Sequence, residues 1–334
     1  MSWELQNNLE AKKEIRKVYG DTLESLILDG KDIMVCDSDL VGSSGAGKIY
    51  KEYKDNSVNF GICEQNMIAG VASMSVMGYK PFVHSFSPFV SRRVMDQIYV
   101  SAGFSKNDLH IYASEPGFWS QYNGATHTTF EDFAIMRSIP EITVVSPSDG
   151  VTFEWVMRYY AEHGGVFYNR CTRRNIPMIY KEGSTFEYGK ANLIQEGKDV
   201  LIIAEGSMVA DALKAAKKLN EQGVSTGVID LLFIKPLDTD LIRREANKYK
   251  LVISVENHNI YGGVGEAVGT ELALMNAKCG FRRLGVQDRY GQVGTVDYLK
   301  KIYHISTEDI EETALEYLKN EWYKTRFIRL FKKR

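Results

Sequence analysis

The chain has few cysteines, four in 334 residues. Cys36, Cys63, Cys171 and Cys279 lie far apart and form no C-x-x-C pair, which argues against a disulfide framework and a structural zinc site. No uninterrupted apolar stretch reaches the ~18 residues that span a bilayer. The first residues show no signal-peptide pattern. We therefore expect a protein made and used in the reducing cytoplasm.

The net charge is also small. A formal charge of -2 leaves no electrostatic footprint for binding nucleic acid. A composition of 44% hydrophobic and 25% charged residues is ordinary for a soluble globular protein, and 334 residues are enough for two domains. No internal repeat or low-complexity stretch is evident.

What the chain does have is a regular alternation of strand-like and helical patterns. Such alternation predicts parallel sheets covered by helices, an α/β fold. We expect strands at residues 33–36, 81–83, 109–112, 142–145, 200–204, 224–229 and 251–255, and helices at 64–77, 96–105, 150–163 and 262–276. Polarity rises near residues 181–184, so we predict two three-layer α/β/α domains with mostly parallel sheets, 1–188 and 189–334.

One carboxylate stands at the start of an expected helix. A short apolar run, Ser57 to Ile62, precedes Glu64, and apolar residues recur at helical spacing after it. Backbone N–H groups and the positive end of the helix gather at such a position. Taken alone, this position favours a glutamate that only complements the helix dipole over one that catalyses.

Two glycine-rich segments invite a nucleotide-binding interpretation. Residues 42–48 match a phosphate-binding loop up to Lys48, but Ile49 replaces the Ser or Thr that would hold magnesium. Residues 263–269 follow a strand, yet the third glycine comes one position late for a dinucleotide fingerprint. We interpret the second segment as a glycine turn that lets a strand and a helix pack closely.

Six separated motifs together carry a resemblance to a known family. They are Asn59 to Gly70, Phe82 to Arg93 with Asp96-Gln97-Ile98, Gly124-Ala125-Thr126-His127, Ile135 to Pro140, Val255-Glu256-Asn257-His258 with Tyr261-Gly262-Gly263, and Asp288-Arg289-Tyr290-Gly291. In this order they resemble the C-terminal half of transketolase, from about residue 10 to about residue 318. The resemblance implies a pyrimidine-binding domain in 1–188 and a transketolase C-terminal domain in 189–334.

The resemblance implies thiamine diphosphate as the cofactor. The family places a carboxylate on N1′ of the aminopyrimidine ring, and Glu64 matches it. Phe86 and Phe89 match aromatic residues that line the pyrimidine pocket, and we expect Arg92, in the same matched segment, to bind the cofactor as well. His127 matches a histidine that hydrogen-bonds the hydroxyls of the donor sugar. Without the resemblance, the two phenylalanines would be ordinary core residues and His127 a side chain bonding backbone.

The substrate residues only partly follow the family. Arg16, Ser43 and Arg170 match two arginines and a serine that bind the sugar phosphate. Ser114 stands where the family has a histidine, with Glu115 beside it, and Asn123 stands where the family has an aspartate. We therefore expect an anionic ketose, phosphorylated or carrying another acidic group, that differs from the standard pentose phosphates.

The family's diphosphate-binding half has no counterpart here. The resemblance implies that a Gly-Asp-Gly motif and a later asparagine hold the diphosphate and its metal, Mg²⁺ or Ca²⁺, and the sequence contains no such motif. We expect no metal ligands in this chain. We expect one subunit of a split transketolase that pairs with an N-terminal subunit in an α2β2 heterotetramer and is inactive alone.

A basic segment ends the sequence. Ser306 to Asp309 resembles a capping box, and Tyr323, Phe327, Leu330 and Phe331 would share one face of the helix that it opens. Such a helix can lie on a membrane surface, in a groove of a partner, or against its own domain.

Three classes of function fit these residues. The first is a ketol transferase of the transketolase type. The second is a β subunit of a 2-oxo-acid dehydrogenase or a deoxyxylulose-phosphate synthase-like carboligase, and the third is a non-catalytic binding module. Arg16, Ser43 and Arg170 favour the first over the second. The presence of Glu64, Phe86, Phe89 and His127 together argues against the third.

Overall fold

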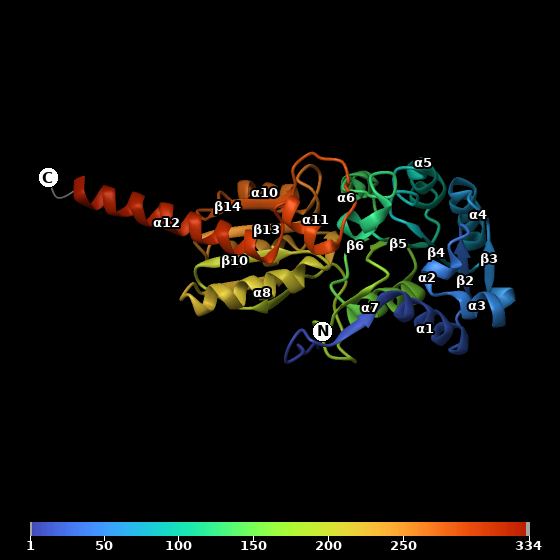
Figure 1. Ribbon diagram of the computed structural model, residues 1–334. Coiled ribbons are helices and arrows are strands. Elements are labelled where there is room, and N and C mark those ends of the chain that lie inside the picture. Colours follow the sequence, from blue (N-terminus) through green and yellow to red (C-terminus); the bar gives the residue numbers. More distant parts are fainter. Residues whose placement is uncertain (1, 332–334) are drawn as a thin grey trace.

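Two mostly parallel sheets form the framework of the chain (Figure 1). The computed structural model describes the backbone of residues 2–331 and the side chains of residues 2–320. Some expected elements match exactly: the predicted strand at residues 200–204 is β10 (Val200–Ala204), and the predicted helix at residues 150–163 is α7 (Gly150–His163). The helix expected at residues 96–105 is instead a short α5 (Met95–Gln97) followed by the π-helical η2 (Ile98–Phe104). The predicted α/β class is confirmed.

The larger sheet has seven strands in the order β12-β6-β7-β5-β4-β2-β3. All neighbours are parallel except β12, which pairs with β6 in the antiparallel sense. The strands are β12 (Phe233–Lys235), β6 (Thr143–Val145), β7 (Val166–Arg170), β5 (Leu109–Ser114), β4 (Lys80–Phe86), β2 (Ile33–Asp37) and β3 (Ser57–Asn59). A sheet of this kind collects the carboxyl ends of its parallel strands at one edge.

The second sheet has five strands in the order β14-β13-β10-β11-β9, with β9 antiparallel. A separate antiparallel pair joins β1 to β8 near the N-terminus. The strands not yet given are β14 (Gly280–Val286), β13 (Leu251–Asn259), β11 (Thr226–Asp230), β9 (Asn192–Gln195), β1 (Lys12–Glu14) and β8 (Asn175–Pro177).

Helices cover both faces of each sheet. Those of the first half are α1 (Ile15–Leu28), α2 (Val41–Ser44), α3 (Gly47–Glu52), η1 (Lys54–Asn56), α4 (Glu64–Val76), α5 (Met95–Gln97), the π-helical η2 (Ile98–Phe104), η3 (Gly117–Asn123), α6 (Asp132–Ser138) and α7. Those of the second half are α8 (Met208–Glu221), α9 (Thr239–Ala246), α10 (Val264–Leu274), α11 (Val296–Ile302) and α12 (Thr307–Phe331).

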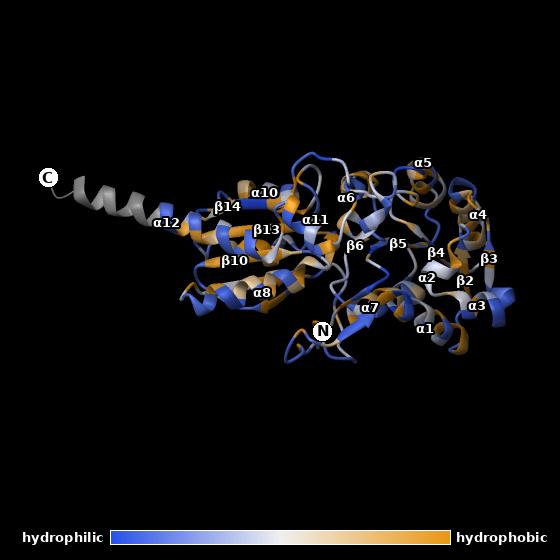
Figure 2. Ribbon diagram, viewed as in Figure 1, coloured by the Kyte–Doolittle hydropathy of each residue, from blue (hydrophilic) through white to orange (hydrophobic). Residues whose placement is uncertain are grey.

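The core consists of two apolar layers, one on each side of the sheets. Alternate residues of β2 enter different layers: Ile33 and Val35 pack with α1 and α7, whereas Met34 and Cys36 pack with α4 and η2. Both layers continue into the second half, where α8 and α12 cover one face and α9 and α10 the other. Figure 2 shows the same pattern, with apolar strands inside and polar outer faces on helices such as α8.

The two halves share one sheet. β12 comes from the second half of the sequence but forms the edge of the first sheet beside β6. The side chain of Asp149 caps α7 and also accepts hydrogen bonds from the backbone N–H groups of Ile179 and Tyr180, both at 2.9 Å, which ties the connecting segment to the first half. A division at residue 188 remains a prediction.

The last helix begins as predicted. The Ser306 backbone N–H donates to Asp309 at 2.8 Å, and the Asp309 backbone N–H donates to the Ser306 hydroxyl at 3.3 Å, which is the reciprocal pattern of a capping box. The side chains of Tyr323, Phe327, Leu330 and Phe331 lie outside the described residues, so the proposed membrane or partner contact of the tail stays a prediction. Among residues 2–331, none of the helices combines the length and apolar character that crossing a bilayer requires.

Candidate active site

The carboxyl ends of four neighbouring strands define one edge of the seven-stranded sheet. β2 ends at Asp37, β4 at Phe86, β5 at Ser114 and β7 at Arg170. Asp37, His84 and Ser114 lock three of these ends together: Nδ1 of His84 is 3.0 Å from Asp37 Oδ2, and Nε2 is 2.9 Å from Ser114 Oγ. All three side chains are buried, so this contact fixes the edge on which the site is built.

Glu64 is the first residue of α4, directly after β3 and a turn. Gly61 adopts φ +72° in that turn, a left-handed conformation that glycine reaches without strain. The Glu64 side chain is 3% exposed, and its Oε2 accepts a hydrogen bond from Nη1 of Arg93 at 2.8 Å. Glu64 is thus a buried carboxylate whose charged partner, Arg93, is itself 41% exposed.

Aromatic rings continue from this carboxylate along the edge. The guanidinium carbon of Arg93 lies 4.0 Å from the centre of the Phe89 ring. The Phe89 ring centre is 6.3 Å from that of Phe86, and the His127 ring packs against both, at 5.2 Å and 6.1 Å. The structure therefore brings together Glu64, Phe86, Phe89 and His127, four residues that the sequence predicted for one site.

Arg92 positions the loop that carries His127. Its guanidinium donates to the backbone oxygens of Thr126 and Thr128, at 3.3 Å and 3.4 Å, and forms an ion pair with Glu131 at 2.5 Å. These bonds hold the residues on either side of His127. Arg92 therefore belongs to the site as a support for the histidine, and its predicted contact with the cofactor is untested.

A cationic cluster, formed by Arg173 and Arg174 around Glu115, adjoins Phe86. The guanidinium carbon of Arg173 is 5.4 Å from the Phe86 ring centre, and its Nε donates to Glu115 Oε1 at 2.6 Å. Nε of Arg174 is 3.2 Å from the same oxygen, and the Thr172 hydroxyl donates to Glu115 Oε2 at 2.9 Å. We call Glu64, Arg93, Phe89, His127, Phe86, Arg173 and Glu115 the site wall.

Arg16 and Ser43 also lie near this cluster. The Arg16 backbone N–H donates to the carbonyl oxygen of Arg173 at 3.1 Å. Gly45, two residues after Ser43, packs so closely on the carbonyl of Arg16 that any side chain would collide with it, and its φ of +86° also favours glycine. The fold therefore places the ends of α1 and α2 that carry Arg16 and Ser43 beside the segment of Arg173.

Two predicted substrate residues occupy other places. Arg170 is 2% exposed, and its guanidinium donates to Asp132 at 2.6 Å and to the backbone oxygen of Asn257 at 2.7 Å. Ser114 is fully buried and bound to His84. The polar atoms of both side chains are engaged inside the protein, and their predicted contact with the substrate stays a prediction. Asn123 is exposed at the end of η3, four residues before His127.

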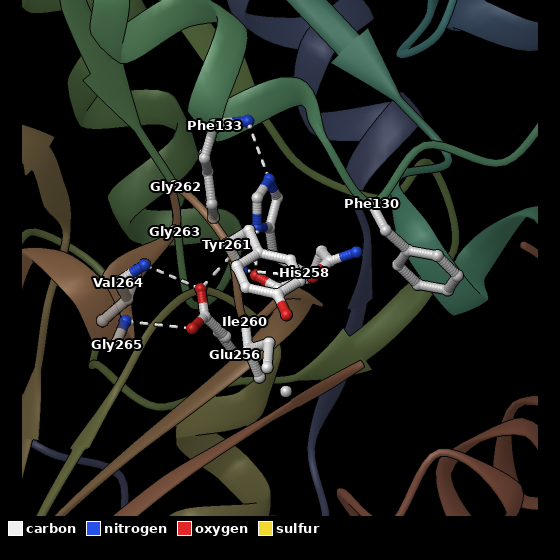
Figure 3. A network of polar contacts seen from close by, with 12 residues as sticks. Phe130, Phe133, Glu256, His258, Ile260, Tyr261, Gly262, Gly263, Val264 and Gly265 are labelled. Carbon is white, nitrogen blue, oxygen red and sulfur yellow. Dashed lines mark hydrogen bonds and ion pairs between the residues drawn. The ribbon is translucent and has the colours of Figure 1, made fainter. Parts of the chain in front are cut away.

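The glycine turn before α10 is filled by a side chain of this chain (Figure 3). The Glu256 carboxylate accepts hydrogen bonds from the backbone N–H groups of Val264 and Gly265, at 2.7 Å and 2.9 Å, and burial raises its pKa to about 8. In this structure the Glu256 carboxylate therefore takes the place at the N-terminus of α10 that a bound anion would otherwise occupy. In the other glycine-rich segment, Lys48 pairs with Glu24 at 2.5 Å.

Sequence reasoning missed Arg93, Arg173, Arg174 and the role of Glu115. Arg93 was within a matched segment but next to Arg92, and nothing in the sequence distinguished the two. Arg173 and Arg174 follow Arg170 by three and four residues. The available signal was that the strand ending near Arg170 stops before Arg173, so the later arginines lie in the loop beyond the sheet edge. Within residues 2–320, no group of His, Cys, Asp and Glu side chains is arranged to hold a metal ion.

The two halves of the chain match two described families. Residues 11–178 match "Transketolase, pyrimidine binding domain", and residues 189–310 match "Transketolase, C-terminal domain". The chain belongs to the transketolase family, as the resemblance of its motifs indicated. Dependence on thiamine diphosphate goes with membership of this family.

Relatives of the same extent are components of split transketolases. The chain is 36% identical to a 6-deoxy-6-sulfo-D-fructose transketolase subunit of Clostridium sp. (strain MSTE9), over 90% of this chain and 94% of that protein. It is 32% identical to one of the subunits of the apulose-4-phosphate transketolase of Phocaeicola vulgatus, over 94% and 100%. A solved split-gene transketolase, an inactive β4 tetramer, matches with a TM-score of 0.82 and 31% identity, over 90% and 97%.

These matches define the kind of enzyme. The chain corresponds to the C-terminal part of a transketolase, a transferase, and has the same extent as these split-transketolase subunits. The site wall fits the cofactor of the family, because a buried carboxylate beside two phenylalanine rings suits a flat, nitrogen-containing aminopyrimidine ring. Glu64, Phe86 and Phe89 are the residues that would hold that ring.

Proposed function

We propose that this chain and an N-terminal subunit transfer a two-carbon ketol unit from an anionic ketose to an aldehyde, with the site wall as this chain's share of the active site. The observation that carries the proposal is that one sheet edge aligns a buried carboxylate, an aromatic surface, a histidine and a cationic cluster. In order along the wall, the carboxylate and the aromatic surface would bind the cofactor ring, the histidine would bind the sugar hydroxyls, and the cationic cluster would bind the acidic group of the sugar.

Each residue of the wall has a distinct task. Thiamine diphosphate, when bound, supplies the carbon nucleophile that the family uses on a ketose carbonyl. Glu64 would hold a proton against the pyrimidine nitrogen, and the rings of Phe86 and Phe89 would fix the plane of the cofactor ring. His127, oriented by the loop that Arg92 holds, would donate to or accept from hydroxyls beside the reacting carbon.

The anionic end of the substrate would bind at the cationic cluster. Arg16, Ser43 and Arg173 lie on neighbouring segments, and guanidinium groups recognise oxyanions through paired hydrogen bonds. The named substrates of the two relatives, 6-deoxy-6-sulfo-D-fructose and apulose 4-phosphate, each carry an acidic group away from the ketol end. An anionic ketose of this general kind is the donor or product that we propose here. Asn123, near His127, would contact its hydroxyls.

The exposed apolar residues beside Glu64 support a protein partner on this face. Ile62, two residues before Glu64, is 73% exposed. Further exposed apolar residues lie at the far end of α4 (Val76, with Met77 directly after it) and on η2 (Tyr99, Val100 and Phe104). α4 and η2 pack on each other, so these side chains belong to adjacent elements. We place the N-terminal subunit here, in an α2β2 heterotetramer of the cytoplasm, and assign the diphosphate and its Mg²⁺ or Ca²⁺ to that subunit.

The test is a transfer assay on the purified complex of both subunits with thiamine diphosphate and magnesium. The donors would be xylulose 5-phosphate, fructose 6-phosphate, apulose 4-phosphate and 6-deoxy-6-sulfofructose, each with a panel of aldehydes. We expect transfer from at least one donor and none from either subunit alone. A complex that binds the cofactor but transfers from none of the four donors, or turns over 2-oxo acids instead, would overturn the proposal.

A further inference from the structure

Glu115 is a buried carboxylate in the middle of the cationic cluster. It is 1% exposed, lies directly after β5, and adopts φ +54°, a conformation that residues other than glycine seldom adopt. Both of its oxygens are engaged: Oε1 accepts a hydrogen bond from Nε of Arg173 and forms an ion pair with Nε of Arg174, and Oε2 accepts a hydrogen bond from the Thr172 hydroxyl. The backbone and side-chain contacts therefore hold this charge firmly in one place.

These contacts decide which atoms of the arginines remain available. Both arginines meet Glu115 through Nε, whereas their terminal Nη atoms form no hydrogen bond with any other described residue of the chain. Arg16 follows the same pattern, since its Nε donates to Glu14 at 2.8 Å. The Nη atoms of a guanidinium are its paired donors for an oxyanion, and here they are left for a ligand.

The carboxylates also set the net charge of the cluster. Arg173 and Arg174 carry two positive charges against the single negative charge of Glu115, and the pair Arg16–Glu14 is formally neutral. The cluster therefore has a formal excess of one positive charge. A sulfonate carries one negative charge, whereas a phosphate ester carries about 1.5 to 2 at neutral pH. A dianion placed beside the buried Glu115 would leave excess negative charge poorly solvated.

We propose that Glu115 is a specificity residue that makes the cluster prefer a ketose ending in a singly charged oxyanion, such as a sulfonate, over its phosphate counterpart. This inference rests on the proposed function, because it assigns the charge class of the substrate that the same site would take. Glu115 acts by subtracting one charge and by holding Arg173 and Arg174 with their Nη atoms free.

The experiment compares two ketoses that differ only at carbon six, 6-deoxy-6-sulfofructose and fructose 6-phosphate, in the assembled complex. Glu115→Gln keeps the shape and can still accept from Arg173, but it raises the cluster charge by one. We expect the ratio of kcat/KM for sulfonate over phosphate to fall roughly tenfold, mainly through KM. Arg174→Gln lowers the charge by one and should move the ratio the other way.

Glu271→Gln is the matched control. Glu271 binds Nε and Nη2 of Arg243 at 3.0 Å and 2.7 Å between α9 and α10, so this variant also breaks a carboxylate–arginine contact, at a site outside the cluster. We expect its ratio to equal that of the wild type. Ratios within about twofold of wild type in both cluster variants, with transfer intact, would overturn the inference.

A second readout separates this inference from the proposed function. Binding of methanesulfonate and methyl phosphate to the complex, measured by calorimetry at pH 8 without any donor sugar, needs no turnover. A shift of preference toward methyl phosphate in Glu115→Gln supports the inference even if no ketose is transferred. Unchanged preference overturns it even if transfer proceeds. Because Arg174 is partly exposed, its variant also keeps the test valid if Glu115→Gln fails to fold.

Discussion

Arg93 lies between Phe89 and Glu64, with its guanidinium carbon 4.0 Å from the ring centre and its Nη1 donating to the carboxylate at 2.8 Å. A planar group that stacks on the phenylalanine and donates to the glutamate meets the same two surfaces that an aminopyrimidine ring would use. In this chain alone, Arg93 therefore satisfies the buried carboxylate, which would otherwise be an unpaired charge in the interior.

This contact predicts competition between Arg93 and the cofactor. Arg93→Met removes the donor but keeps an apolar side chain over Phe89, so the cofactor no longer has to displace an ion pair. We expect the complex to bind thiamine diphosphate several-fold more tightly, as measured by calorimetry. Arg92→Met serves as a comparison, since it frees the His127 loop instead and should reduce turnover. Weaker cofactor binding in Arg93→Met would show that the arginine helps to hold the cofactor.

Glu64→Gln tests the central carboxylate. The amide keeps the size and can still accept from Arg93, but it cannot exchange a proton with a pyrimidine nitrogen. We expect transfer by the complex to fall by at least about 100-fold, with an unfolding temperature close to that of the wild type. Residual activity near the wild-type rate would remove Glu64 from the mechanism.

The buried Asp37–His84–Ser114 contact predicts a stability effect rather than a kinetic one. Asp37→Asn removes a charged acceptor that serves His84 and also the backbone N–H of Leu40. We expect a loss of about 1–3 kcal/mol in the free energy of unfolding, measured with urea. Asp55→Asn, at an exposed position in η1, should change it by less than about 0.5 kcal/mol. Equal effects of the two substitutions would argue against a locked strand edge.

Buried histidines predict how stability depends on pH. Burial lowers the pKa of His110 to about 3, below its ordinary value of 6.5. Between these values the unfolded chain binds a proton that the folded chain does not, so stability falls as the pH drops below about 6.5. The loss in the free energy of unfolding due to His110 approaches about 1.4 kcal/mol per pH unit until the pH nears 3. We would measure the free energy of unfolding with urea at several values from pH 7 to pH 4.5. It should change less with pH in His110→Gln than in the wild type, and the same pH dependence in both would contradict this account.

The sequence predicted the parts of the site that local pattern controls. Glu64 begins a helix because a short strand and a turn precede it. Phe86 and Phe89 share the site wall because Phe86 is the last residue of β4 and Phe89 follows it by three residues. Arg170 and Arg173 could not be distinguished in this way. β7 ends at Arg170, which turns inward to Asp132, whereas Arg173 lies beyond the sheet and faces Phe86.

Long-range pairings account for what sequence reasoning could not reach. Glu115 meets arginines 58 and 59 residues further along the chain, and β12 is a three-residue edge strand that joins a sheet built from the other half of the sequence. Neither feature has a local signal, because each depends on where distant segments meet in the folded chain.

The position of Asn123 predicts a change in substrate preference. Asn123 is exposed at the end of η3, and the loop that follows it leads to His127, whose ring contacts Phe86 and Phe89. Asn123→Asp would place a negative charge and a stronger acceptor near the sugar hydroxyls. We expect kcat/KM for xylulose 5-phosphate to rise several-fold relative to that for 6-deoxy-6-sulfofructose in the assembled complex. Tyr122→Phe, a neighbouring exposed position, is the control and should leave the ratio unchanged. If the substrate profile of Asn123→Asp equals that of the wild type, the identity of this residue does not set the preference, and the charge of the cluster around Glu115 becomes its main determinant.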